Sequence, residues 1–349
     1  MVKTKLQRIK KINNDFQIES SFYDHYISLD WSQNNMAIAR MTMHSNQVKI
    51  IDVPADIEEL KLYLKNLKGR KILTIEETNT TQWLYVELQD YTDYILVCDP
   101  YRNRLLSEGA KNDKIDAEKL CKLLRSGLLK EVYHSASDLY DLRKLYSAYD
   151  DLVKAGVRLQ NQKSAIYRSA GKRVKTKNKF NSSTTEFILK YIDKGVEGYE
   201  KTKKEFEKYI HSRNSRENLL KQQKTIPGIG DICALKIVST VVDVNRFSNT
   251  GKYLSYCGLV RHKKISGNRL YGQKKTRYSR RVKSAYKTAA NSAIGGNNPI
   301  NEYYKYLICQ RGLSEDKARN QIARYLARVS YGMLKSGKEY DPYRWRKNK

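Results

Sequence analysis

Residues 24–53 read DHYISLDWSQNNMAIARMTMHSNQVKIIDV and decide the fold of the first part of the chain. The apolar, β-branched run DHYISLDWS predicts a strand, QNN predicts a turn, and MAIARMTM and VKIIDV predict two more strands. Helical periodicity follows in ADIEELKLYLKNLK, with apolar positions that include Leu60, Leu62, Leu64 and Leu67. Two short strands are predicted in KILTIEE and YILVCDP, and two helices in TQWLYVELQDY and KIDAEKLCKLLRSGLL.

The order of these elements indicates the fold class. Three strands come first, and helices and strands then alternate, which is typical of an α/β unit with a mixed sheet. This order matches that of a ribonuclease H-like fold. We expect such a domain over residues 24–137, preceded by a basic N-terminal arm over residues 1–23.

Residues 138–222 have a different composition. Two long stretches are highly charged and almost free of Gly and Pro, and the basic, polar segment GKRVKTKNKFNSSTT between them predicts a loop. We predict two helices that form an antiparallel hairpin or coiled coil, packed against each other or against a partner chain. A helical linker with no nucleic-acid role fits the same pattern equally well.

The last region, residues 223–349, includes the stretch TIPGIGDICALKIVSTVVD. Pro227, Gly228 and Gly230 predict a tight turn before a helix, as in a helix-hairpin-helix element whose backbone N–H groups can bind a phosphate. The later stretch DKARNQIARYLARVSYGMLKSGKEYDPYR predicts a helix with a polar end. The chain is therefore predicted to combine an α/β domain, a helical coiled-coil insert and a mostly α C-terminal domain.

The charge balance narrows the function. The chain has 349 residues and a formal net charge of +30, with 67 Lys and Arg against 37 Asp and Glu. Such an excess favours a polyanionic partner, first of all nucleic acid, over a merely solvated basic surface. The five cysteines show no CxxC spacing, which argues against a zinc knuckle or a disulfide framework and favours a reducing cytoplasm. No apolar run reaches the ~18–20 residues of a membrane span, so no membrane partner is expected.

Four acidic residues stand out in this basic chain. Asp30 lies in the apolar run YISLDWS, Glu76 in ILTIEETN, and Asp113 and Asp116 in KNDKIDAEKL. Asp113 and Asp116 are three residues apart, so they share one helix face, where two carboxylates repel unless a proton or a cation lies between them. An oxygen-only ligand set suits Mg²⁺ or Mn²⁺, and two such ions can support phosphoryl transfer.

Each acid also has a structural interpretation. Asp113 could cap the helix that starts near Lys114, and Asp116 could favour the dipole of that helix. Glu77 could be the ligand in place of Glu76. The order and spacing of the four acids together favour the metal site.

These residues resemble the DEDD transposases of the bridge-RNA insertion sequences, whose RuvC-like N-terminal domain carries Asp, Glu, Asp and Asp. LDWS looks like the first-strand Asp of the family, EETNTTQW looks like its Glu-x-Thr-Gly segment, and KNDKIDAEKL resembles its Lys-Thr-Asp-x-x-Asp-Ala helix. The second segment favours Glu76 over Glu77. The stretches TIPGIGDICA, NRFSNTGKYLSYCGLV and SGN resemble the C-terminal transposase domain of the family, so the resemblance covers residues 26–335.

Two departures from the family pattern stand near these motifs. Asn79 replaces the Gly after Glu-x-Thr, and because Asn tolerates the left-handed conformation, we expect the turn to survive. The later Lys-x-Gly reads Arg277-Tyr278-Ser279, which removes a Gly from the basic segment.

The resemblance also implies the remaining parts of the site. Ser266 matches the nucleophilic serine of the family, although its SGN context alone indicates an ordinary turn. The resemblance further implies a composite site that joins the two domains, in a homodimer or homotetramer, with Mg²⁺ or Mn²⁺ on the four carboxylates. It implies a noncoding bridge RNA that pairs with target and donor DNA.

The segment around Ser266 is strongly basic, with eleven Lys or Arg and no acid between Arg261 and Lys287. Phosphate contacts by such residues give affinity but not sequence choice, and the sequence does not distinguish RNA from DNA as the ligand. The residues expected to bind nucleic acid are Arg261, Lys263, Lys264, Arg269, Lys274, Lys275, Arg277, Arg280 and Arg281.

The sequence thus predicts an RNA-guided DNA transposase or recombinase that cleaves, exchanges and rejoins strands. We expect it in the cytoplasm of a bacterium or archaeon, associated with the nucleoid. Three alternatives stay open: a site-specific DNA invertase of the same family, a RuvC-like Mg-dependent nuclease or junction resolvase that uses water, and a non-catalytic nucleic-acid-binding protein with a decayed site. The four intact acids speak against the last of these.

Overall fold

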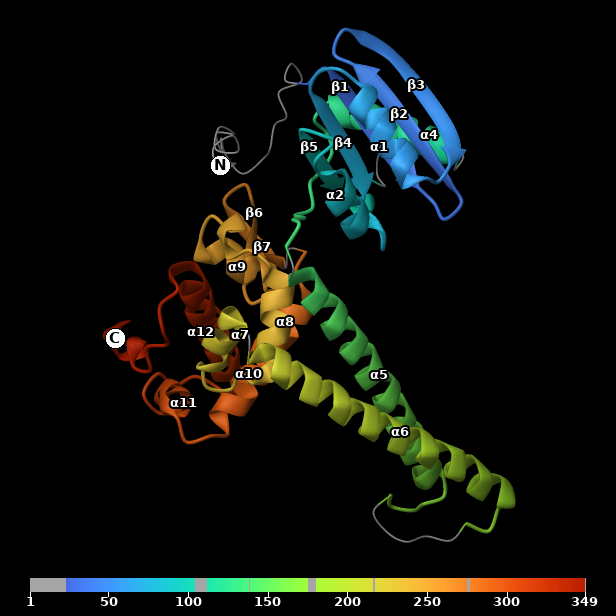
Figure 1. The fold of residues 1–349 in the computed structure, drawn as a ribbon. Coiled ribbons are helices and arrows are strands. Elements are labelled where there is room, and N and C mark those ends of the chain that lie inside the picture. The colour runs from blue at the N-terminus through green and yellow to red at the C-terminus, as the bar shows by residue number, and fades with distance from the viewer. Residues whose placement is uncertain are drawn as a thin grey trace. The chain divides into compact units, whose positions relative to one another are not determined.

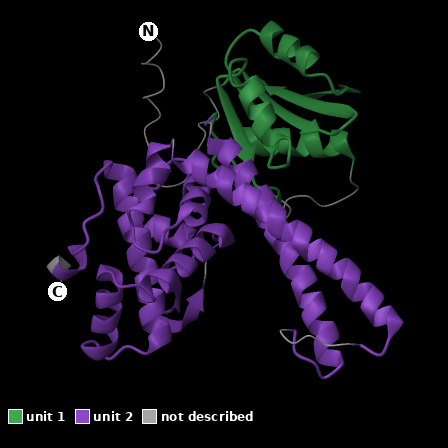
Figure 2. Cartoon of the chain, turned by 60° about the horizontal axis from the view of Figure 1, so that its bottom comes forward, with its two compact units in different colours: residues 1–136 green, residues 137–349 purple. Residues whose placement is uncertain are grey.

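The computed structural model describes residues 23–103, 112–137, 139–174, 180–215, 217–274 and 277–348. Residues 1–22 of the predicted basic arm therefore lie outside the described residues, as does Lys275. The chain forms two compact units, residues 1–136 and residues 137–349 (Figure 2).

The first unit contains the predicted mixed sheet (Figure 1). Its strand order is β3-β2-β1-β4-β5, in which β1, β2 and β3 pair antiparallel and β1, β4 and β5 pair parallel. The strands are β1 (His25–Trp31), β2 (Asn35–Thr42), β3 (Ser45–Pro54), β4 (Lys71–Glu76) and β5 (Tyr94–Cys98). The α/β class is confirmed, and the topology is compatible with a ribonuclease H-like fold.

Helices cover both faces of this sheet. Leucines of α1 (Ile57–Asn66) and α2 (Thr81–Leu88) share one core cluster with the odd-numbered residues of β1, such as Ile27 and Leu29. The even-numbered Tyr26 belongs to the opposite cluster, which contains the apolar side of α4 (Asp113–Arg125). The period-2 alternation of β1 therefore determines which side chains face α4. The short helix α3 (Pro100–Asn103) follows β5.

The second unit begins with the predicted helical hairpin. Its two arms are α5 (Leu139–Ser169) and α6 (Ser183–Asn214), which lie side by side (Figures 1 and 2). The sequence pattern suggests one continuous second helix up to Lys224, but the chain breaks after Asn214 and resumes in α7 (Asn218–Lys224). At the break, the buried Asn214 side chain donates a hydrogen bond to the backbone oxygen of Asp231, 17 residues further along the chain, at 2.9 Å.

The base of the hairpin and the C-terminal helices share one core. Leu142, Tyr146 and Ile210 of the hairpin belong to the same buried cluster as Tyr253 and Tyr286 of the later helices. The remaining elements of this unit are α8 (Asp231–Val241), η2 (Val244–Arg246), α9 (Thr250–Tyr256), β6 (His262–Ser266), β7 (Arg269–Lys274), α10 (Arg280–Ile294), α11 (Pro299–Cys309), α12 (Glu315–Ser336) and η3 (Arg344–Asn348). Of the helices in the described part of the chain, none has the length and apolar character needed to cross a membrane.

Candidate active site and nucleic-acid interface

Two of the predicted acids lie at the C-terminal ends of neighbouring parallel strands. The ladder between β1 and β4 runs up to the pair Leu29 and Ile75, so the next residues, Asp30 and Glu76, are neighbours across the sheet. Leu29 and Ile75 belong to the core on the α1 and α2 side. Because side chains alternate along a strand, Asp30 and Glu76 point toward the opposite face, which α4 covers.

Two hydrogen bonds fix α4 against β1. The Cys121 thiol donates to the backbone oxygen of Tyr26 at 3.2 Å, and the Ser28 hydroxyl donates to the backbone oxygen of Ala117 at 2.5 Å. Moving two residues forward along β1, from Tyr26 to Ser28, therefore corresponds to moving four residues backward along α4, from Cys121 to Ala117. The lengths agree, since two strand residues and four helix residues each span about 6 Å.

The same spacing, continued by one more step, places Asp113 beside Asp30. Electrostatics agree with this geometry, because the pKa of Asp30 is raised, first by burial and then by the negative charges of Asp113 and Asp116. Three of the four predicted acids thus share one electrostatic environment. We call the surface formed by Asp30, Glu76, Asp113 and Asp116 the carboxylate face.

The start of α4 decides one of the structural alternatives. The side chain of Asn112 accepts a hydrogen bond from the backbone N–H of Lys114 at 3.0 Å, so Asn112 is the N-cap. The interpretation of Asp113 as the cap is therefore wrong. Asp116 does lie in the first turn of the helix, where the dipole favours an acid. The Lys114 ammonium lies 3.2 Å from Asp52, a carboxylate outside the carboxylate face.

Glu76 and Glu77 have different environments. Glu76 is the last residue of β4, half-buried, and pairs in register with Cys98 of β5. Glu77 is exposed and follows the strand, and its backbone N–H donates to the backbone oxygen of Cys98 at 3.0 Å. Strand alternation directs Glu76 toward α4, whereas no strand fixes the direction of Glu77.

The turn after Glu76 does not use a left-handed residue at Asn79. Among the described residues, only Val242 and Asn268 are non-glycine residues with positive φ. The Thr81 hydroxyl stabilises the turn instead, because it donates to the backbone oxygen of Glu76 at 2.7 Å and accepts from the backbone N–H of Thr78 at 2.7 Å. The turn therefore survives the replacement of Gly by Asn79, as expected, although Asn79 does not take the left-handed conformation.

The donor chemistry of the carboxylate face fits a hard divalent cation. Its donor atoms are carboxylate oxygens, which hard divalent cations prefer. The pKa of Asp30 is raised first by burial and then by like charges, which a cation would neutralise. Within the described part of the chain, no three acidic, histidine or cysteine side chains lie close enough together to hold a metal ion as they stand. Binding of a cation would therefore require the carboxylates to draw together.

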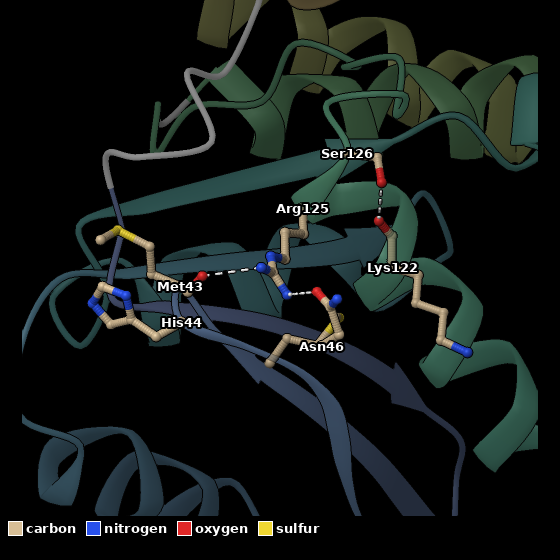
Figure 3. Close-up of a pocket in the computed structure, with 7 residues that line it drawn as sticks. Met43, His44, Asn46, Lys122, Arg125 and Ser126 are labelled. Atoms are coloured by element: carbon tan, nitrogen blue, oxygen red, sulfur yellow. Dashed lines mark hydrogen bonds between the residues drawn. The ribbon is translucent and has the colours of Figure 1, made fainter.

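A pocket of about 670 Å³ lies at the other end of the sheet (Figure 3). Its lining comes from the end of β2, the turn that follows, the start of β3 and the C-terminal end of α4. The Arg125 guanidinium in this pocket donates to the backbone oxygens of Ser45 at 2.6 Å and Met43 at 3.0 Å, so it joins α4 to the β2–β3 turn. The carboxylate face begins at the N-terminal end of the same helix, so this pocket is not its cavity.

Ser266 lies on an element that sequence reasoning missed, the antiparallel hairpin β6–β7. We call residues 262–274 the ribbon. Ser266 pairs with Arg269 across a two-residue turn, in which Gly267 and Asn268 have φ values of 52° and 61°. Left-handed values at both central positions define a type I′ turn. The Gly-Asn pair was the available signal, because it is typical of two-residue hairpin turns.

The ribbon exposes almost all of its side chains. Every residue of β6 is exposed, and Ile265, Leu270 and Tyr271 have exposed fractions of 63%, 59% and 71%. The histidine nearest to Ser266 in sequence, His262, contacts the Ser255 hydroxyl at 3.0 Å. His262 thus has a hydrogen-bond partner on α9.

The basic residues around the ribbon are accessible to a ligand. Eight of the nine predicted residues are exposed, and the ninth, Lys275, lies outside the described residues. One of them, Arg281, also contacts the protein itself, because its guanidinium lies 5.7 Å from the centroid of the Tyr146 ring. A two-stranded ribbon of this kind has the dimensions to enter the major groove of duplex DNA.

The turn at Pro227 to Gly230, where a phosphate was predicted to bind, is followed directly by a carboxylate, that of Asp231. Gly228 has a φ of 86°, and a Cβ at this position would collide with the backbone oxygen of Ala289, so the turn requires glycine. Asp231 follows in the first turn of α8, where its carboxylate lies 2.5 Å from the Lys224 ammonium and 2.9 Å from His211. These contacts lower the pKa of Asp231 despite its partial burial. An intramolecular anion thus neutralises this helix N-terminus.

A mixed sheet with acids at the C-terminal ends of its parallel strands, together with an exposed cationic ribbon, is a combination expected of a nucleic-acid-processing enzyme. Comparison with known families agrees. Residues 27–170 match a family model described as a transposase, of the DEDD and IS110 type, and residues 221–305 match a second model described as the transposase IS116/IS110/IS902 family. The chain belongs to the IS110 family of transposases, which makes it a DNA-cleaving and DNA-recombining enzyme. No curated protein matches it.

Proposed function

We propose that this protein is an RNA-guided DNA transposase that cleaves, exchanges and rejoins DNA strands. In this proposal Asp30, Glu76, Asp113 and Asp116 bind Mg²⁺ or Mn²⁺, and Ser266 is the nucleophile. The observation that supports the metal site is geometric: Asp30 and Glu76 follow the last ladder pair of two neighbouring parallel strands, and the hydrogen bond between Ser28 and Ala117 fixes α4 against the same sheet. The matches to two transposase models, one covering the acids and one covering the serine, support the reaction class.

The proposed role of the four carboxylates is to hold a divalent cation beside the reacting phosphate. A bound divalent cation would supply Lewis-acid stabilisation to phosphate oxygens. The carboxylates would hold it from β1, β4 and α4, which are anchored by the ladder that runs to Leu29 and Ile75 and by the hydrogen bond between Ser28 and Ala117. Because the backbones of these elements are anchored, the movement that draws the carboxylates together is limited to their side chains, which reduces the reorganisation needed when charge develops on the phosphate.

Ser266 provides the covalent step. Its Oγ attacks a backbone phosphorus of DNA, an Oγ–P bond forms, and the bond from phosphorus to the leaving sugar oxygen breaks. The serine proton is transferred to the leaving oxygen. Because the ester linkage is conserved, a hydroxyl of a second strand can attack the same phosphorus, which releases the serine and rejoins the strands without any further energy source.

The exposed cations around the ribbon position the nucleic acid. Lys263, Lys264 and Arg269 flank Ser266 on the ribbon itself and can contact phosphates on both sides of the cleavage point. Such contacts carry no sequence information. Pairing of a bridge RNA with target and donor DNA would supply the sequence choice, as in other RNA-guided systems.

A paired set of serine variants tests the covalent mechanism. Ser266→Ala should abolish strand exchange and the covalent protein–DNA product while leaving DNA binding intact. Ser284→Ala is the matched control, since this exposed serine lies on α10 in the same basic segment and donates only to the backbone oxygen of Arg281. Strand exchange that survives in Ser266→Ala would instead favour hydrolysis by water, as in a RuvC-like nuclease.

RNA guidance needs a separate measurement. RNA that co-purifies with the protein from a host carrying the complete element should be sequenced. We expect one discrete noncoding species encoded beside the gene. A random sample of cellular RNA would contradict RNA guidance without affecting the serine mechanism.

A further inference from the structure

The end of the α5–α6 hairpin carries a surface that the proposed reaction does not use. We call residues 163–174 and 180–194 the hairpin tip. The opposite end of the hairpin is buried in the core of the second unit, but the tip extends away from that core within the unit (Figures 1 and 2). Packing of that core therefore does not explain the exposed aromatic side chains of the tip.

Contacts between the two helices fix their register up to the tip. The Tyr149 hydroxyl donates to the Glu207 carboxylate at 2.8 Å, and the Lys163 ammonium lies 2.6 Å from Asp193. The two helices thus advance by equal numbers of residues in opposite directions. One further turn brings Tyr167 to the level of the first turns of α6.

The hairpin tip carries two pairs of aromatic rings. Tyr167 and Phe180 pack edge to face with ring centroids 5.1 Å apart, and Phe187 and Tyr191 contact each other at 4.8 Å. Phe187 is 61% exposed, Tyr191 is 55% exposed, and Ile188 between them is 42% exposed. Apolar rings at this exposure are unfavourable in water, and a cluster of them marks a binding surface.

Cations surround these rings. The hairpin tip contains six Lys or Arg against two acids, and one of the acids is the Asp193 already paired with Lys163. The Lys172 ammonium lies 4.4 Å from the centroid of the Phe180 ring, and the Lys194 ammonium lies 5.5 Å from that of Tyr191. Exposed rings flanked by cations are the combination that proteins use for single-stranded nucleic acid, because the rings stack on bases and the cations contact phosphates.

We propose that the hairpin tip binds unpaired nucleotides of an RNA, with Phe187 and Tyr191 stacking on the bases. This inference rests on the proposed RNA guidance. Bases of duplex DNA are stacked on one another and cannot stack on a side chain, whereas the loops of a folded RNA present unpaired bases. A second copy of the tip is disfavoured as the partner, because two surfaces with the same excess of positive charge repel each other.

The test compares a double variant with a matched control on the same helix. Phe187→Ala/Tyr191→Ala removes both exposed rings, and Ala keeps the helix intact because it has the highest helix propensity. Tyr209→Ala is the control, since Tyr209 is 59% exposed on α6 but lies about 27 Å from Tyr191 along the helix. The probe is a labelled, mixed-sequence single-stranded RNA, and a duplex DNA of the same sequence serves as the reference.

We expect the double variant to bind the RNA at least about tenfold more weakly and the duplex DNA as the wild type does. The control should stay within about twofold of the wild type for both ligands. Three results would overturn the inference: unchanged RNA affinity, an equal loss for RNA and duplex DNA, or a changed sedimentation coefficient of the free protein with RNA affinity intact. The last result would identify the tip as an interface between copies.

Failure of this inference is distinguishable from failure of the proposed function. The measurement is an equilibrium affinity, so Ser266→Ala should bind the RNA probe normally even though it cannot exchange strands. A wild-type protein with no affinity for RNA would contradict both RNA guidance and the tip. A wild type that binds RNA and a double variant that binds it equally well would contradict the tip alone.

Discussion

The carboxylate face, which is proposed to bind metal, and the ribbon, which carries the proposed nucleophile, differ in how the surrounding structure holds them. Asp30 and Glu76 end two central strands, and α4 is fixed over them by the bond between Ser28 and Ala117. Ser266, in contrast, lies beside the turn of a two-stranded ribbon with no buried residue. One half is built into a core, and the other is presented on an exposed element.

The difference indicates which groups must be held in place before the substrate binds. Carboxylates that repel one another must be held by a core, since otherwise they would move apart. An isolated two-stranded ribbon is marginally stable in water, so nucleic acid that covers Ile265, Leu270 and Tyr271 would order it. We therefore expect changes on the carboxylate face to alter chemistry and changes on the ribbon to alter presentation of the serine.

The largest effect is expected on the carboxylate face. Asp113→Asn removes one negative charge beside Asp30 and should reduce strand cleavage by at least about 10³-fold, with nucleic-acid binding retained. Asp52→Asn is the matched control, because Asp52 pairs with Lys114 of the same helix outside the carboxylate face. Rates from a single-turnover cleavage assay check this, and equal losses in the two variants would contradict a special role for Asp113.

A turn substitution on the ribbon should have the next largest effect. Asn268→Val places a β-branched residue at a φ of 61°, which costs about 1–2 kcal/mol locally. Strand exchange should fall by about tenfold, the equivalent of about 1.4 kcal/mol, without a change in the melting temperature of the second unit's core. Asn268→Gly accommodates the same φ and should keep activity. A lowered melting temperature in Asn268→Val would show that the ribbon is part of the core after all.

Removing a hydrogen bond that holds α4 against β1 should reduce cleavage less than the two changes above. Ser28→Ala removes the hydrogen bond to the backbone oxygen of Ala117, and the free energy of unfolding should fall by about 1 kcal/mol. Cleavage should slow a few-fold because the positions of Asp113 and Asp116 are less well defined. Ser126→Ala, at the exposed far end of the same helix, removes a bond to the backbone oxygen of Lys122 and is the control. Chemical denaturation and cleavage rates measure the two effects.

The smallest effect concerns one phosphate contact. Arg269→Gln should lower the magnitude of the slope of log affinity against log salt by about 0.9 on duplex DNA, because one fewer counterion is released. Arg319→Gln is the control, since Arg319 pairs with Glu315 on α12 at 2.7 Å. Fluorescence anisotropy over a range of salt concentrations measures both slopes. An unchanged slope for Arg269→Gln would remove this residue from the phosphate contacts.

The fold of the first unit could be predicted from the sequence because its signals are local and repeated. The apolar runs YISLDWS and KILTIEE predicted two strands, and the order of strands and helices predicted the α/β class, whereas the face on which Asp30 and Glu76 lie came from the structure. The helix of Asp113 and Asp116 was equally clear. The cap at Asn112 was missed because two adjacent residues could satisfy the same donor, and only the backbone geometry separates them.

The second unit was less predictable for physical reasons. The ribbon has no buried side, so its strands lack the alternation that identifies a strand, and the Gly267-Asn268 turn was the single available signal. At the break after Asn214, the side chain bonds to the distant Asp231, a contact that no local pattern encodes. The role of Ser266 followed only from family resemblance, because an exposed turn serine looks the same with or without chemistry.

The most direct measurement of the central claim is the identity of the residue that becomes linked to DNA. Wild-type protein should be stopped during strand exchange, digested with trypsin and a nuclease, and examined by mass spectrometry. We expect the nucleotide on the peptide Ile265–Arg269, which trypsin releases by cleaving after Lys264 and Arg269, with the modification on Ser266. A nucleotide on another residue, or strand exchange with no linked peptide, would contradict the serine mechanism.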